Sequence, residues 1–133
     1  MRAVLDTNVI VSGLLKPGGN EAAVLGLVAE GRIVLCATPA ILAEYEEVLS
    51  RRRLGLDPVQ VRRFLAALAA VAVVVRPTAT VDASPDEADN RFLECAETVE
   101  ADVLVIGNAR HFPKRWKRTR VANARALLAM LEA

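Results

Sequence analysis

Short apolar runs alternate along this chain with longer segments whose apolar positions recur every three to four residues. The apolar runs, such as RIVLCA, VAVVV and VLVIG, lack strict apolar–polar alternation, which is typical of strands buried on both faces of a parallel sheet. The longer segments have the spacing of amphipathic helices. The predicted strands are 2–6, 32–37, 71–75 and 103–107, with a short edge strand near 120–121. The predicted helices are 20–30, 38–52, 57–69, 84–100 and 124–132, and 8–15 forms a short helix or turn.

Capping and breaking residues set several of these boundaries. Thr38–Pro39 and Asp57–Pro58 each place a capping residue before a proline at the first helical position. Ser84, Pro85, Asp86 and Glu87 have the pattern of a capping box, again with proline at the first helical position. The order of strands and helices predicts an α/β fold, a three-layer α/β/α sandwich with a four- to five-stranded, mainly parallel sheet.

Length and composition narrow the class of protein. A chain of 133 residues predicts a single domain, 1–133. A net charge of +1 implies no particular partner. The two cysteines, Cys36 and Cys95, lack the close pairing of a zinc site and are expected to be small buried thiols. Asp6 interrupts the first apolar segment and no stretch reaches membrane-spanning length, so we expect a soluble, cytoplasmic protein without a membrane partner.

Candidate chemistry starts with acidic side chains beside apolar ones. Asp6 ends the first strand, and in an open α/β sheet sites form at the carboxyl ends of strands, although an Asp there can equally cap the next helix. In the helix 38–52, Glu44 and Glu46 lie at the two edges of the apolar face, while Glu47 points away from it. The helix alone does not choose between Glu44 and Glu46.

Two further acids lie in the helix 84–100. Asp89 flanks the apolar face, where a carboxylate needs a cation, a metal or hydrogen-bond donors, and Arg91 is an ordinary candidate partner. Asp86 lies in the first turn, where a negative charge suits the helix dipole. Clustered acids without His or Cys favour a hard cation such as Mg²⁺ or Mn²⁺, and with it phosphate chemistry.

Four segments together resemble a known family. VLDTNVIVSGLL, ILAEYEEVLSR, DEADNRFLECA and ADVLVIGNARHFP occur in the order and spacing of PIN-domain proteins, and the nearest subgroup resembles the VapC-type ribonucleases of toxin–antitoxin pairs. The resemblance implies a metal-dependent endoribonuclease in which Asp6, Glu44 and Asp89 are catalytic and hold Mg²⁺ or Mn²⁺. It thereby selects Glu44 over Glu46.

The resemblance also implies secondary roles and partners. Many family members have a fourth acid where this chain has Asn108, which offers a carbonyl oxygen but no charge. Asp86 is a weaker candidate for the missing charge, and Thr7 and Asn8 are candidates for supporting Asp6. The implied reaction is hydrolysis of an RNA phosphodiester to a 5′-phosphate and a 3′-hydroxyl. The implied protein partners are a cognate antitoxin and a second copy of the chain.

The charge distribution suggests where RNA would lie. Residues 82–102 contain eight acids and one Arg, whereas 110–120 contain six Lys or Arg and no acid. A basic flank beside an acidic site suits a phosphate backbone, and an aromatic ring can stack on a base. The candidates for RNA contact are Arg110, Lys114, Arg115, Trp116, Lys117 and Arg118. A solvated loop or an antitoxin-binding surface is the alternative, and the cluster Arg51–Arg53 is interpreted as a helix end favoured by the dipole.

Two other functions remain open. A phosphatase of the haloacid dehalogenase type also has an Asp after its first strand, but it needs a second Asp two residues later, where this chain has Asn8. Activity on a small phosphate ester would identify it. The other alternative is a catalytically weak or inactive PIN-fold protein that acts by binding RNA or an antitoxin, because Asn108 replaces an acid. The apolar segment VRRFLAALAAVAVVV has a composition suited to a dimer interface as well as to a core.

Overall fold

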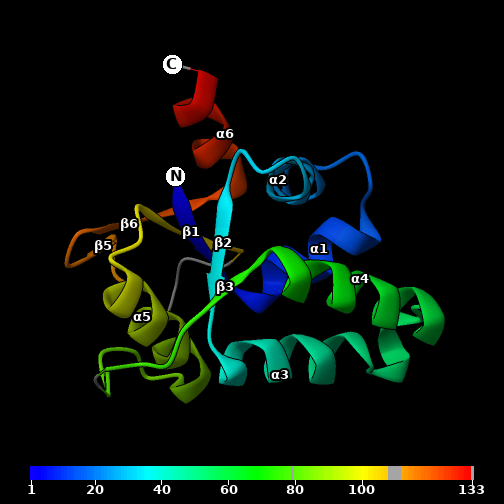
Figure 1. Ribbon diagram of the computed structural model, residues 1–133, viewed down its shortest axis with the longest axis horizontal. Coiled ribbons are helices and arrows are strands. Elements are labelled where there is room, and N and C mark those ends of the chain that lie inside the picture. Colours follow the sequence, from blue (N-terminus) through cyan, green and yellow to red (C-terminus); the bar gives the residue numbers. More distant parts are fainter. Residues whose placement is uncertain (79, 108–111, 133) are drawn as a thin grey trace.

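The structure is a computed structural model that describes residues 1–78, 80–107 and 112–132 (Figure 1). The candidates Asn108 and Arg110 therefore lie outside the described residues. The strands are β1 (Arg2–Leu5), β2 (Val34–Ala37), β3 (Val73–Val74), β4 (Val103–Ile106), β5 (Arg115–Trp116) and β6 (Thr119–Asn123). The helices are α1 (Thr7–Leu15), α2 (Asn20–Ala29), α3 (Pro39–Leu49), α4 (Pro58–Val71), α5 (Glu87–Val99) and α6 (Ala124–Glu132), with a short 3₁₀ helix η1 (Arg52–Leu54) after α3.

The strands form one sheet in the order β3-β2-β1-β4-β6-β5. Every neighbouring pair is parallel except β5 and β6, which form an antiparallel hairpin. The predicted α/β fold with a mainly parallel sheet is confirmed. The described sheet has six strands instead of four or five, because the basic stretch predicted to be irregular contributes the two-residue strand β5.

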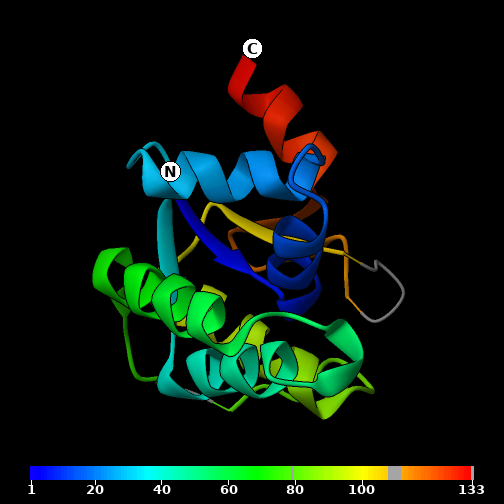
Figure 2. The same cartoon turned by 90° about the vertical axis from the view of Figure 1, so that its right-hand side faces the viewer.

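Helices cover both faces of the sheet. Helix α5 contacts β1, β2 and β4 and lies on one side of the sheet in Figure 1, with α1, α2 and α4 on the other side. Figure 2, which is turned by 90°, shows α1, α2 and α4 in front of the strands and α5 behind them. Helix α3 contacts α1, α4 and α5, so it joins the helices of the two layers beyond the ends of the strands.

The core consists mainly of aliphatic side chains. Strand β4 is buried along its whole length, which fits a central strand of a parallel sheet. Both cysteines are buried and free, as expected from the sequence, and burial raises the pKa of the Cys95 thiol to about 12. Within the described residues, no helix is long and apolar enough to cross a membrane.

Two predicted elements were wrong in detail. Residues 71–75 do not form a buried strand: α4 continues through Val71, and β3 is a two-residue edge strand whose Val73 and Val74 are 41% and 45% exposed. The Ala-rich sequence before Val71 favours helix, which shortens the strand. The helix predicted over 84–100 begins only at Glu87, as α5. Asp86 is its N-cap in place of Ser84, since Asp86 Oδ1 accepts the Ala88 N–H at 3.0 Å.

Candidate active site

Asp6 lies directly after β1 and is the N-cap of α1. Its Oδ1 accepts the backbone N–H groups of Asn8 at 2.6 Å and Val9 at 3.2 Å, and its Oδ2 accepts the Gly107 N–H at 3.1 Å. Although Asp6 is only 4% exposed, its carboxylate lines a cavity. Burial raises the pKa of Asp6 from 3.8 to about 6; the three backbone donors oppose this rise and the charge of Asp89 adds to it.

Glycine at position 107 makes this arrangement possible. A Cβ built on Gly107 would lie 2.7 Å from the Cβ of Asn8, closer than real side chains approach each other. Strand β4 therefore ends close against the first turn of α1 only because this residue has no side chain. The same approach brings the Gly107 N–H to the carboxylate of Asp6.

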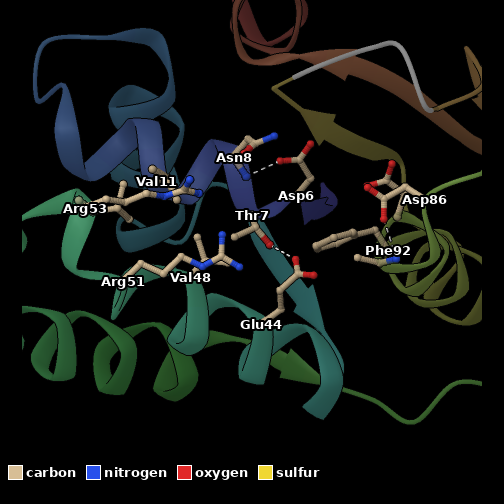
Figure 3. A pocket seen from close by; sticks show the side chains of 13 residues that line it. Asp6, Thr7, Asn8, Val11, Glu44, Val48, Arg51, Arg53, Asp86 and Phe92 are labelled. Carbon is tan, nitrogen blue, oxygen red and sulfur yellow. Dashed lines mark hydrogen bonds between the residues drawn. The ribbon is translucent and has the colours of Figure 1, made fainter.

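Helix α3 contributes Glu44. The Thr7 hydroxyl donates a hydrogen bond to Glu44 Oε2, which holds this half-buried carboxylate toward Asp6 (Figure 3). The next residue, Tyr45, is fully buried, and its hydroxyl donates to the carbonyl oxygen of Leu5 at the end of β1. Helix α3 is thereby fixed to the strand that carries Asp6. Glu46 is exposed and lines a different hollow between α3 and α4.

Asp89 and Asp86 come from the start of α5. The Ser84 hydroxyl lies 3.4 Å from Asp89 Oδ2, to which it donates, and both Asp86 and Asp89 have further partners. Asn90 is fully buried and fixes the preceding loop: its Oδ1 accepts the N–H groups of Ala83 at 3.1 Å and Ser84 at 2.8 Å, and its amide donates to the Ser84 carbonyl at 3.1 Å. Arg91, the ordinary partner considered for Asp89, forms salt bridges with Glu87 and Glu94.

These side chains meet in one hollow of about 300 Å³, which we call the acidic cavity. It lies beside the carboxyl end of β1, and α1, α3, η1 and the start of α5 form its walls (Figure 3). Its lining residues are Asp6, Thr7, Asn8, Val11, Glu44, Val48, Arg51, Arg53, Leu54, Asp86, Ala88, Asp89 and Phe92. The structure thus places six of the predicted site residues, Asp6, Thr7, Asn8, Glu44, Asp86 and Asp89, around one space.

The acids of the cavity are not packed into a tight cluster. Across the described ranges, no three His, Cys, Asp or Glu side chains lie close enough together to form a ready-made metal centre. The cavity still offers four carboxylates, of which Asp6 is buried, Glu44 and Asp89 are half-buried and Asp86 is exposed. The arrangement can bind a cationic or metal-bridged ligand at the edge of the sheet.

The described part of the basic stretch lies elsewhere. Lys114, Arg115, Trp116, Lys117 and Arg118 belong to the β5–β6 hairpin or its flank, and none of them lines the acidic cavity. Lys117 pairs with Glu97 at 3.3 Å and Arg118 with Glu100 at 2.6 Å, so two of these cations meet acids near the C-terminal end of α5.

Sequence reasoning missed two groups of residues at this site. Arg51 and Arg53 line the cavity, although their position suggested only a helix end. Asn90 was noted as part of a motif, but its role in fixing the loop before α5 depends on contacts six and seven residues away. A buried polar residue beside the apolar face of a helix is the signal that could have indicated Asn90, because such a group needs partners.

The chain is similar to known proteins in sequence and in fold. A family model described as a PIN domain matches residues 2–110. The uncharacterised protein MJ1680 of Methanocaldococcus jannaschii is 32% identical over 112 residues, which make up 81% of this chain and 71% of that protein. The fold is similar to a chain in the crystal structure of VapBC2 from Rickettsia felis bound to a DNA fragment from their promoter. That match has a TM-score of 0.61 and 19% identity, and it covers 92% of this chain and 98% of that one.

Proposed function

This chain belongs to the PIN-domain family, and from its acidic cavity we propose that it is a metal-dependent endoribonuclease of the VapC type. One observation carries the proposal: Asp6, Glu44 and Asp89, from the end of β1, from α3 and from α5, line a single cavity at the carboxyl edge of a parallel sheet. In such sheets this edge is where ligands bind.

The residues present fit Mg²⁺ or Mn²⁺. The proposed donors, Asp6, Glu44 and Asp89, are all carboxylates, and hard divalent cations prefer oxygen ligands. Mg²⁺ keeps several waters and binds through one or two carboxylates, so a tight group of three acids is not required. A cation bound there would polarise the phosphate and lower the pKa of the attacking water. It would also offset the cost of burying the charge of Asp6.

The protein's own residues have distinct proposed roles around that ion. Asp6 is held in one orientation by three backbone N–H groups, so its position costs no reordering when the substrate binds. Thr7 orients Glu44 by donating to it, and Ser84 does the same for Asp89. Asp86 adds negative charge at the start of α5. Asn8 supports Asp6 through its backbone N–H, which Asp6 Oδ1 accepts.

Protein partners are part of the same proposal. The structural neighbour named above is a VapBC2 complex, which supports a cognate antitoxin as a partner. We also propose a homodimer that buries the exposed valines of α4 and β3.

The test of the enzymatic proposal compares two neighbouring glutamates. Purified wild type is incubated with a labelled structured RNA in Mg²⁺, in Mn²⁺ or in EDTA, beside Glu44→Gln, Asp89→Asn and the control Glu46→Gln. We expect metal-dependent cleavage by wild type and by Glu46→Gln. In Glu44→Gln and Asp89→Asn the rate should fall by at least about a hundredfold, since even outer-shell changes at metal sites cost up to that much.

The possible results separate the proposal from its alternatives. Cleavage that persists in EDTA or in Asp89→Asn would contradict the proposed site. If wild type cuts no RNA in either metal yet binds RNA or an antitoxin, the chain is a binding protein of the PIN fold. Hydrolysis of a small phosphate ester in place of RNA would favour the phosphatase.

A further inference from the structure

The acidic cavity has a positively charged wall that the sequence did not indicate. Arg51 follows α3, Arg53 lies in η1, and both line the cavity together with the carboxylates. In Figure 3 these two arginines lie on one side, Asp86 and Phe92 lie on the opposite side, and Asp6 and Glu44 lie between them. Charge is therefore separated across the cavity, with the cations near η1 and the acids from the middle of the cavity to the start of α5.

Contacts within the fold do not account for these cations. Arg51 pairs with Glu47 at 2.9 Å, but the two side chains are 41% and 62% exposed, and such surface pairs contribute little to stability. That pair uses Nε and Nη2 of Arg51, so Nη1 remains available. Within the described part of the chain, Arg53 forms no salt bridge.

We propose that Arg51 and Arg53 bind a backbone phosphate of RNA adjacent to the phosphate that is cut, which makes them substrate-positioning residues. The inference rests on the proposed ribonuclease function. A guanidinium group binds phosphate through two parallel hydrogen bonds, and arginine is therefore suited to fixing a phosphate in one orientation. Two arginines beside four carboxylates also lower the repulsion that a polyanion meets on entering the cavity.

The proposal fixes the path of the RNA across the protein. The RNA strand runs over the cavity from the start of α5 to η1, along the C-terminal end of α3. This path leads away from Lys117 and Arg118, which do not line the acidic cavity. The basic stretch near the end of the chain then contributes less to RNA affinity than these two arginines do.

Arg52 provides a matched control. It lies between the two arginines, has the same charge and is exposed, but it does not line the cavity. The experiment measures binding of a short, fluorescently labelled single-stranded RNA by anisotropy in EDTA, at several salt concentrations. Wild type is compared with the double variant Arg51→Gln/Arg53→Gln, with Arg52→Gln, and with Arg51→Lys/Arg53→Lys.

We expect the glutamine double variant to bind RNA about tenfold more weakly, since hydrogen bonds to charged groups are the stronger ones. The slope of log affinity against log salt should fall by about 0.7, because one phosphate contact with a single strand is lost. The lysine variant should keep the salt slope and lose part of the affinity. Arg52→Gln should change neither quantity by more than a small fraction of that effect.

Equal losses in Arg52→Gln and in the double variant would overturn the inference, because the effect would then follow net charge alone. Unchanged binding in the double variant, or no RNA binding by wild type, would also overturn it. Circular dichroism of each variant confirms that the fold is kept. In cleavage assays the double variant should raise KM more than it lowers kcat, as expected for a residue that binds a phosphate away from the reacting one.

This test is independent of the test of the proposed function. Wild type that binds RNA through Arg51 and Arg53 without cutting it would leave the phosphate site standing and refute the ribonuclease. Wild type that cuts RNA while the double variant binds and cuts equally well would refute only the phosphate site.

Discussion

The carboxylate of Asp6 accepts hydrogen bonds from the backbone of two separate segments, the start of α1 and the end of β4. It caps the first helix through two N–H groups, and it receives a third from the end of β4. An acid that ends a strand can be either a cap or a site residue, and here the cap places the side chain in the cavity. Capping and the proposed catalytic role are therefore compatible in a single side chain.

The buried carboxylate of Asp6 predicts a pH dependence of stability in the metal-free protein. Its pKa is about 6 in the fold against 3.8 without these surroundings, so between about pH 4 and about pH 6 the folded state binds more protons than the unfolded state. The free energy of unfolding should therefore fall as pH rises through this window, by about 3 kcal/mol in all, and change no further above it. Asp6→Asn removes the titrating group and keeps an oxygen for the cap.

The measurement is urea unfolding of wild type and of Asp6→Asn in EDTA across this pH range. The stability of wild type minus that of the variant isolates Asp6 from the other acids. A difference that stays constant with pH would contradict the prediction.

Sequence reasoning about single residues succeeded where one local pattern decided the outcome. The apolar run before Asp6 predicts it at the end of a strand, and helical periodicity predicts Asp89 beside an apolar face; both line the cavity. Glu44 and Glu46 could not be distinguished from the helix, because both flank its apolar face. What separates them is tertiary: Glu44 faces α1 and α5, while Glu46 faces the groove between α3 and α4. The resemblance to a family made that choice, and the periodicity did not.

Contacts between elements at Gly107 hold the site together. Strand β4 reaches the first turn of α1 only because position 107 has no side chain. Gly107→Ala should lower the free energy of unfolding by about 1–3 kcal/mol, as overpacking typically does. It should also reduce the proposed cleavage activity, because the N–H that Asp6 accepts is displaced.

The control is Gly26→Ala in α2, where an added Cβ meets no atom within 4 Å. This change should raise stability by up to about 1 kcal/mol, because alanine favours helix more than glycine does. Urea denaturation of both variants gives the comparison. Equal stability changes in the two variants would show that the close approach at Gly107 has no structural importance.

The predicted elements failed where neighbouring structure overrode local preference. The run VAVVV has strong strand character, yet only Val73 and Val74 pair with β2, since α4 extends through Val71. The capping box at Ser84 satisfied every local rule, but Asn90 binds the backbone of Ala83 and Ser84 and keeps that segment outside the helix. Both results depend on contacts that a local window of sequence does not contain.

The whole molecule leaves apolar side chains exposed along α4 and β3. Val71, Val73 and Val74 are 49%, 41% and 45% exposed, and Val59 at the other end of α4 is 44% exposed. The edge of β3 also presents backbone groups beside these side chains, and such edges favour association. This surface is where we propose that two copies of the chain meet.

Light scattering of the purified protein should give about twice the chain mass of 14.3 kDa. Val71→Lys should shift the protein to the monomer, because a desolvated lysine has no partner at an apolar interface. Leu15→Lys, a change of a 45% exposed side chain on α1, is the control and should leave the dimer intact. A monomeric wild type, or equal effects of the two variants, would contradict the proposed interface.

The hydrogen bond between Gly107 and Asp6 joins residues 101 positions apart, so during synthesis it forms long after Asp6 has been added to the chain. The chain emerges from the ribosome with its N-terminus first, so β1 emerges long before β4, with which it pairs. Until β4 has been translated and has left the exit tunnel, Asp6 lacks the Gly107 N–H and one edge of β1 has no partner strand. Non-local pairing of this kind is also slow to form. The nascent chain therefore acquires its acidic cavity only after the strand that follows α5 has been synthesised.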